Sequence, residues 1–348
     1  MARCLWRVSL LLAVAAVVVG CAGPPRPRPR PGSLPFPGPF SLYRVADVEK
    51  FDEHSYGLPP LFKNGSRGTF YTEKAGFLDI AHIRWSIDWG WYYHHHAHAA
   101  LTEGKTEVTL TTNKPSRLRI QFHYPEKWDQ LPAEERAALI DELALRVGQE
   151  AAWIIGIWHE TATYFGYASF VVVSESGSAF TYEDMFSHLI GLYVLEQAVR
   201  SDEPDFDRAV TVALDEMLQS LEPYDPEASH EAALAVKGEW WRGGKAIRRN
   251  LALGLDGEPL RPWLIPEAPG EPGRYGEPRH VPGLHDMADP ALRTFATFAI
   301  EPHIWQANAI RAAADTEDTL IHPDDLPRIA DHLRAELHAK HGPDADRP

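Results

Sequence analysis

Cysteine is nearly absent from this chain of 348 residues, which contains only Cys4 and Cys21. Both lie near the N-terminus, so the rest of the chain can form no disulfide and carries no free thiol. Stability must therefore come from ordinary packing. A chain of this length can supply it, because it can bury a sizeable core in one large domain or two closely packed ones.

Basic residues are also scarce, with 34 Lys and Arg against 49 Asp and Glu and a formal net charge of −15 at pH 7. An acidic chain is repelled by phosphate backbones, which argues against a nucleic-acid partner. No stretch after Cys21 approaches the roughly 20 apolar residues of a membrane-spanning helix. The chain also lacks internal repeats, a glycine fingerprint for phosphate and the G-x-S-x-G elbow of many serine hydrolases.

The N-terminus has the pattern of a targeting signal. Arg3 and Arg7 precede an apolar run at residues 8–20, which suits a signal peptide but is too short to span a bilayer. The run ends in Val-Val-Gly-Cys, which resembles a bacterial lipobox, where a peptidase cuts before a lipidated cysteine. We therefore predict that residues 1–20 are removed and that Cys21 carries acyl chains such as palmitate; an ordinary secretory signal is the alternative.

These features predict a lipoprotein of the bacterial cell envelope, on the periplasmic side and most naturally at the outer membrane. Proline occupies nearly every second position from residue 22 to residue 40, which fixes φ and favours an extended spacer over packed structure. We expect lipidated Cys21 and a tether at residues 21–41, followed by a single globular domain at residues 42–348.

The most apolar helical segment is residues 148–167, GQEAAWIIGIWHETATYFGY. Apolar side chains recur there at three-to-four spacing, yet Glu150 falls on the same stripe, and His159 and Glu160 follow it. An ionisable group on a core stripe is unusual. We expect this helix to be buried at the centre of the domain.

The other segments complete an expected α+β fold, mainly α, in which a helical domain surrounds the buried central helix beside a small β-hairpin. Asp79 stands where a helix N-cap belongs, after a short strand near residues 69–71. The alternating segments 107–112 and 118–124 predict the hairpin. Further helices are expected at residues 182–200, 206–221, 228–253 with a break near 243, 289–314 and 324–340, and a proline- and glycine-rich loop at 254–286.

Polar side chains embedded among aromatic residues mark a candidate site. His82, His159 and Glu160 are the types that hold a divalent metal such as zinc, or that pair as a general base. We predict that these three converge, with Asp79 as orienting partner and with His82 and His159 as metal ligands. A buried polar network without catalytic function is the alternative.

Other residues invite weaker interpretations. Residues 159–163 begin like a zincin helix, but Thr163 stands where the second histidine is required. Glu183 and Asp184 open a helix, where capping explains them better than catalysis, and Asp184 could orient His188 one turn on. Within the histidine run 94–98, only the first and last side chains share a helix face and could bind one ion.

Three blocks carry a resemblance to a known family: GFLDIAHIRWSIDW at 76–89, WHETATYFGY at 158–167 and SAFTYEDMFSHLIG at 178–191. After a lipobox, these resemble a bacterial lipoprotein family known as domain of unknown function 4056. The family blocks have Asn where His188 stands, so the resemblance gives that residue no ligand role. The resemblance supports the site and the envelope location, and it implies no reaction.

Two functions follow as hypotheses. The first is a metal-assisted hydrolase of the cell envelope that uses His82, His159, Glu160 and Asp79. The second is a non-enzymatic envelope lipoprotein that binds a protein or a small molecule and in which the same residues are structural. Whether the chain is an enzyme depends on whether the polar segments cluster around one accessible site.

Overall fold

The computed structural model describes residues 24–27, 29–30, 32–33, 36–37, 43–49, 51–56, 67–166, 175–265 and 276–348. The predicted signal peptide and Cys21 lie outside these residues. Among the helices that the structure describes, none combines the length and apolar character needed to cross a membrane.

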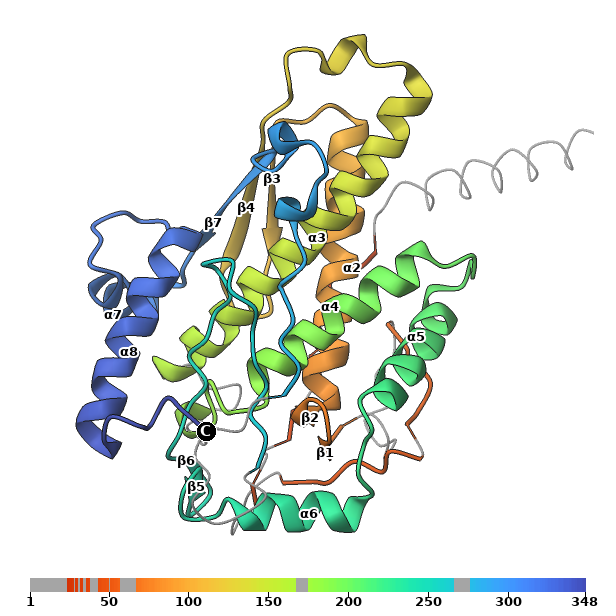
Figure 1. The fold of residues 1–348 in the computed structure, drawn as a ribbon. Helices are drawn as coiled ribbons and strands as arrows, with labels where there is room; N and C mark the ends of the chain where they lie inside the picture. Colours follow the sequence, from red (N-terminus) through yellow and green to blue (C-terminus); the bar gives the residue numbers. More distant parts are fainter. Residues whose placement is uncertain are drawn as a thin grey trace, which may run out of the picture.

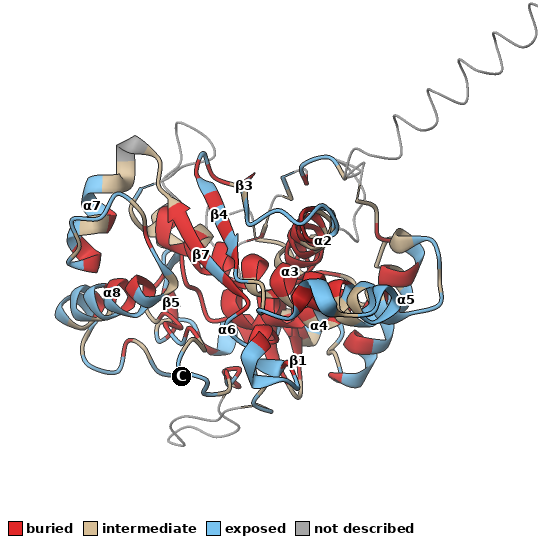
Figure 2. Cartoon of the chain, turned by 90° about the horizontal axis from the view of Figure 1, so that it is seen from above, coloured by how far each residue is buried: buried red, intermediate tan, exposed pale blue. Residues whose placement is uncertain are grey.

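Three helices form the centre of the molecule: α2 (Ile80–Thr102), α3 (Ala133–Tyr164) and α4 (Asp184–Arg200). Figure 1 shows α3 between the other helices and the β3–β4 hairpin. The second half of α3 is buried on nearly every side, as its apolar sequence predicts, and Figure 2 shows the buried residues concentrated on these central helices. The start of α2 is set by Asp79, whose side chain accepts a hydrogen bond from the Ala81 amide at 2.8 Å.

Glycines let the three helices approach closely. A Cβ at Gly148 of α3 would lie 2.9 Å from the Gly90 carbonyl oxygen of α2. A Cβ at Gly191 of α4 would lie only 2.4 Å from the Ile83 carbonyl oxygen of α2. The backbones therefore meet where side chains are absent, which brings side chains on either side of each crossing within reach of one another.

Strands surround this helical centre in three small antiparallel sheets. The hairpin β1 (Thr69–Thr72) and β2 (Gly76–Asp79) leads directly into α2. The largest sheet has the order β3-β4-β7, from β3 (Glu107–Thr111), β4 (Arg117–Phe122) and β7 (Ala296–Glu301). Leu118, Ile120 and Phe122 of β4 alternate toward the core.

The remaining elements cover the core from outside, with exposed residues on their outer faces (Figure 2). They are α5 (Phe206–Ser220), α6 (Pro226–Ala235), the short pair β5 (Trp241–Arg242) and β6 (Lys245–Ala246), α7 (Ile304–Ala314) and α8 (Leu326–His341). Single 3-10 turns occur at Trp128–Gln130, Glu175–Gly177, Leu284–Asp286, Pro290–Leu292 and Pro323–Asp325.

The expected α+β, mainly helical fold is confirmed, together with the hairpin and most helices. Two expected helices are wrong in part. Residues 228–253 are helical only to Ala235, because Gly243 and Gly244 take positive φ in a tight turn between β5 and β6. Residues 289–314 contain β7 before α7, since Thr297, Phe298 and Ile300 favour a strand and β4 offers it a partner edge.

The described residues of the proline-rich segment are exposed at Pro25, Arg26 and Pro29 and contact the domain elsewhere, so the tether at residues 21–41 stays a prediction. Phe36 is fully buried and stacks on Trp241 with ring centroids 5.6 Å apart. Arg30 forms an ion pair with Asp88 of α2 at 2.5 Å. Proline fixes local backbone conformation, but it does not decide whether the extended chain is solvated or lies on the domain.

The close α2–α4 crossing can be tested with two alanine substitutions. Gly191→Ala should destabilise the protein by about 3 kcal/mol, because its Cβ would meet backbone that cannot move aside. Gly156→Ala is the matched control: its Cβ would lie 3.4 Å from the His188 ring, and the gain in helix propensity is about 1 kcal/mol. Chemical denaturation measures both, and equal stability of the two variants would contradict the described crossing.

Candidate metal centre

Three side chains from the three central helices meet at one point. His82 of α2, Glu160 of α3 and His188 of α4 each offer one ligand atom, and these atoms all lie within 4.8 Å of one another. Among the residues that the structure describes, this is the group close enough to hold a metal ion. The close packing of α2, α3 and α4 is what brings together residues so far apart in the sequence.

His188 is held in one orientation by its neighbours. Its Nδ1 lies 2.8 Å from the Ser86 hydroxyl, and its Nε2 lies 3.9 Å from Oε1 of Glu160. The absence of a side chain at Gly156 leaves space for the ring. Because Ser86 occupies Nδ1, Nε2 is the atom left to bind an ion, which is the arrangement that outer groups impose on metal-bound histidines.

His82 is oriented by two carboxylates. Its Nδ1 lies 3.5 Å from Oδ2 of Asp79 and 3.3 Å from Oδ1 of Asp184. Nδ1 forms no hydrogen bond with either carboxylate, and one nitrogen of the ring lies within reach of the ligand atoms of Glu160 and His188. Asp79 is itself fixed, since it accepts from the Ala81 and Ser33 amides and its own amide donates to the Ser187 hydroxyl.

Glu160 has one oxygen satisfied and one free of hydrogen bonds. Oε2 accepts from the Phe180 amide at 3.0 Å, whereas Oε1 is buried without a hydrogen-bond partner. Phe180 adopts a φ of 55°, a strained conformation for a residue with a side chain. Its amide donates to Glu160, and its carbonyl oxygen accepts from the Asn250 amide at 2.9 Å, so hydrogen bonds hold the strained residue on both sides.

His159 lies beside this group and outside it. Its Nε2 is 3.6 Å from Oε1 of Glu160, and its ring centroid is 6.1 Å from that of His82. The Asn113 side-chain amide faces its Nδ1. The His159 side chain is 22% exposed, compared with 1% for His188, so His159 forms the rim of the cluster.

Burial controls the protonation of the cluster. It lowers the pKa of His82 and of His159, so both rings are neutral and able to bind a metal. Burial alone would raise the pKa of Glu160, but the imidazoles of His159, His188 and His82 bring it below its usual range. Burial raises the pKa of Glu183 and Asp184, and neighbouring carboxylates add to that effect.

The charge balance of the cluster fits a cation. Asp79, Glu160, Glu183 and Asp184 are all buried within it, and unneutralised carboxylates at such sites are costly. Several buried atoms lack hydrogen-bond partners here, among them Oε1 of Glu160, Nε2 of His188 and Oε2 of Glu183. A divalent ion would satisfy the first two lone pairs and offset the negative charge of Glu160, the carboxylate whose pKa is lowered.

The structure brings together all four residues of the predicted site, but it distributes their roles differently. His188 completes the group that could hold an ion, whereas His159 stands beside it. Asp184 lies against His82 and not against His188, and Glu183 accepts a hydrogen bond from the Thr181 hydroxyl at 2.9 Å. The sequence indicates a site at His188 only through the polar and aromatic residues that surround it in the block at 178–191.

Other candidates lie apart from this cluster. His94 and His98 share a face of α2 with ring centroids 6.4 Å apart, but exposed His98 pairs with Asp141 at 3.0 Å. Glu150 is ten residues before Glu160 on α3, roughly 15 Å away at 1.5 Å per residue. Glu150 therefore lies outside the His82–Glu160–His188 cluster.

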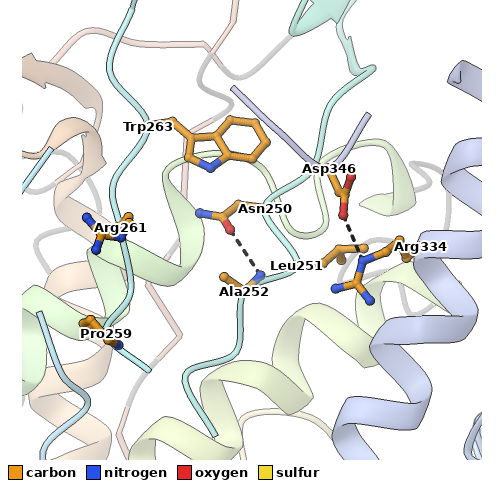
Figure 3. Close-up of a pocket in the computed structure, with 8 residues that line it drawn as sticks. All are labelled: Asn250, Leu251, Ala252, Pro259, Arg261, Trp263, Arg334 and Asp346. Atoms are coloured by element: carbon orange, nitrogen blue, oxygen red, sulfur yellow. Dashed lines mark hydrogen bonds and ion pairs between the residues drawn. The ribbon is translucent and has the colours of Figure 1, made fainter. Parts of the chain in front are cut away.

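A separate cavity of about 260 Å³ lies near α8 (Figure 3). Arg334 of α8 pairs there with Asp346 at 2.9 Å. The cavity contains none of the predicted site residues, so it is distinct from the metal centre. Its lining consists of Asn250, Leu251, Ala252, Pro259, Arg261, Trp263, Arg334 and Asp346.

The fold and the cluster define an α+β, mainly helical protein with a His/Glu group suited to a metal ion. Residues 34–253 match the family described as "Protein of unknown function (DUF4056)", and the chain belongs to that family. The resemblance seen in the three sequence blocks is thus confirmed, and every residue of the cluster lies within the matched part. No curated protein and no solved structure matches the chain.

Glu150 provides a test of burial that is independent of the metal centre. Its Oε2 accepts from the Leu284 amide at 3.1 Å, and burial raises its pKa from 4.5 to about 7. Between these two values the folded state holds a proton that the unfolded state has released. Stability should therefore fall as the pH rises through that window, by up to roughly 3 kcal/mol.

Glu150→Gln should remove this fall, because the amide does not titrate and can still accept from Leu284. Melting curves of parent and variant at pH 5 and pH 8 measure the effect. The variant should gain stability relative to the parent at pH 8 and not at pH 5. If the parent instead became more stable than Glu150→Gln as the pH rises, the folded state would stabilise Glu150 as a carboxylate, and the prediction would be wrong.

Proposed function

We propose that the protein is a metal-dependent hydrolase of the bacterial cell envelope, with a divalent cation such as zinc held by His82, Glu160 and His188. The observation that carries this proposal is the convergence of three ligand atoms within 4.8 Å, two of them buried without hydrogen-bond partners. Ser86, Asp79 and Asp184 add the outer contacts that orient metal-bound histidines.

The ligand set suits catalysis better than a purely structural ion. Two imidazoles and one carboxylate make three protein ligands, which leaves the fourth position of a tetrahedral zinc site open for water or substrate. Structural zinc sites are closed by four protein ligands, most often including cysteine, and the described part of this chain contains none. A bound divalent ion would supply Lewis-acid activation of water and of a carbonyl oxygen.

His159 is placed to move the proton in such a reaction. It stands at the rim, where a substrate would arrive, and burial keeps its ring neutral by lowering its pKa. Asn113 faces Nδ1, while Nε2 points toward Glu160 at the centre of the cluster. Trp85, whose ring is tilted by 46° and lies 5.7 Å from that of His159 between centroids, limits the freedom of the imidazole.

The competing function is a non-enzymatic lipoprotein in which the cluster is architectural. The deep burial of Glu160 and His188 favours it, because a buried polar network can serve only to join helices. The two functions differ in what happens when a ligand is removed. A functional cluster loses its ion, whereas an architectural one leaves a buried carboxylate unpaired and destabilises the fold by about 3 to 5 kcal/mol.

Metal analysis of the purified protein tests the proposal. The parent should carry one divalent ion, and Glu160→Gln and His188→Ala should carry none. Ser86→Ala should lower the affinity roughly 10- to 100-fold, as expected for loss of an orienting contact. His159→Ala should keep the ion and lose hydrolysis of an activated ester.

His98→Ala is the matched control, since it removes an exposed histidine of α2 that pairs only with Asp141 among the contacts described. It should keep both the ion and the activity of the parent. A parent that binds no divalent ion, combined with a large loss of stability in Glu160→Gln and His188→Ala, would contradict the enzyme and support the architectural function.

We also propose that lipid on Cys21 holds the protein at a membrane of the cell envelope. The lipobox supports this, as does the lack of a spanning helix among the described residues. Each buried methylene contributes about 0.8 kcal/mol, so more than one acyl chain gives a stable anchor. Cys21→Ala should be unprocessed or should leave the membrane fraction; a processed variant that stays membrane-bound would contradict the anchor.

A further inference from the structure

The described residues 24–27, 29–30 and 32–33, which we call the strap, run along α2 in the opposite direction to the helix. Their contacts pass from the C-terminal half of α2 to its first turn. In order, the contacts are Pro24 with the His96 side chain, Arg26 over the Trp89 ring at 5.9 Å, Arg30 with Asp88, Gly32 beside His82, and Ser33 with Asp79.

The dimensions of strap and helix agree. Positions 24 and 33 are nine residue steps apart, and a chain of that length in polyproline conformation would cover roughly 28 Å at 3.1 Å per residue. The distance from residue 79 to residue 96 of α2, at 1.5 Å per residue, is roughly 26 Å. The length expected of this proline-rich sequence therefore agrees with the distance between its first and last contacts on α2.

Arg30 forms a buried ion pair on this face of α2. Its Nε lies 2.5 Å from Oδ2 of Asp88, and its second guanidinium nitrogen donates to the Ser55 carbonyl at 2.9 Å. The two side chains of the ion pair are only 5% and 2% exposed. His54 Nε2 approaches the other Asp88 oxygen at 3.1 Å, so the carboxylate is fixed before an arginine arrives.

The C-terminal end of the strap lies on the metal centre. The Ser33 amide donates to Oδ2 of Asp79 at 3.0 Å, the same oxygen that faces Nδ1 of His82. A Cβ at Gly32 would lie 3.3 Å from that oxygen and 3.6 Å from Nε2 of His82. The backbone at Gly32 and Ser33 thus lies against the His82 side of the cluster, where a Cβ would be a tight contact.

We propose that this face of α2 is a binding site for an extended, arginine-containing peptide, and that the strap occupies it in cis and restricts access to the metal centre. Extended backbone supplies the amide for Asp79, arginine supplies the cation for Asp88, and a small residue fits beside His82. The effect on the metal rests on the proposed function; the binding of peptide does not.

Two substitutions in the full chain separate the strap from general stability. Ser33→Pro removes the amide donor to Asp79, and Ser33→Ala is its matched control because it keeps the donor. Arg30→Ala removes the cation from Asp88. Arg30→Ala leaves a buried carboxylate unpaired and can impair folding. If Arg30→Ala does not fold, the comparison of Ser33→Pro with Ser33→Ala still tests the strap.

Hydrogen exchange of the peptide segments on either side of residue 33 reports strap opening without any metal. Ser33→Pro should speed exchange of the neighbouring strap amides roughly tenfold or more, as expected for loss of a hydrogen bond to a carboxylate, and Ser33→Ala should match the parent. Equal protection in Ser33→Pro and Ser33→Ala would overturn the strap contact.

The rate at which a chelator removes zinc from the loaded protein reports access to the centre. Ser33→Pro should lose zinc roughly tenfold faster than Ser33→Ala, in proportion to the opening seen by exchange. An opened strap with an unchanged rate of zinc loss would overturn the claim that the strap restricts the centre. If the parent binds no zinc, the proposed function fails, and the exchange and peptide experiments still decide the binding site.

A synthetic peptide with the strap sequence, PPRPRPRPGS, tests the ligand class. It should bind Ser33→Pro and restore slow exchange of the α2 amides, and it should bind the parent weakly because the site is filled. A peptide with alanine at the position of Arg30 should bind at least tenfold more weakly. Failure of the first peptide to bind the opened variant, or equal binding of the two peptides, would overturn the arginine-peptide site.

Discussion

A buried carboxylate with one unsatisfied oxygen is the constraint on which the rest of the structure depends. Glu160 is almost completely buried on the central helix, and only one of its oxygens receives a hydrogen bond. Such a group is expensive unless charge or hydrogen bonds compensate it. The neighbouring imidazoles supply part of that compensation. A cation bound by the free lone pairs of Glu160 and His188 would supply the rest.

The way the helices pack explains how the ligands reach one point. Glycines at the α2–α3 and α2–α4 crossings let the backbones approach within van der Waals contact. A further glycine, Gly156, makes room for the His188 ring beside α3. The same small residues that allow dense packing therefore also position the three ligands, which is why the centre is rigid and its outer contacts are preformed.

Local patterns in the sequence predict much of this arrangement. Asp79 as N-cap, the buried second half of α3 and the approach of His82, His159 and Glu160 follow from spacing and burial. The role of His188 does not, because it depends on the angle at which α4 crosses α2 and on Ser86 from another helix. The residues of β7 were assigned to a helix because only the edge of β4 makes that segment a strand.

The contacts of the strap are a second feature that local sequence patterns do not predict. Alternating proline predicts an extended chain correctly, but it carries no information on what that chain lies against. The Arg30–Asp88 ion pair joins residues far apart in the sequence, and the length match with α2 appears only when the helix and the strap are seen together. Composition alone therefore does not show where a proline-rich segment makes such contacts.

Diffraction from crystals of the zinc-loaded protein, with anomalous differences recorded at the zinc absorption edge, tests the central claim most directly. We expect one strong peak between the side chains of His82, His188 and Glu160. A peak at the histidine run of α2, or none in crystals grown with zinc, would contradict it.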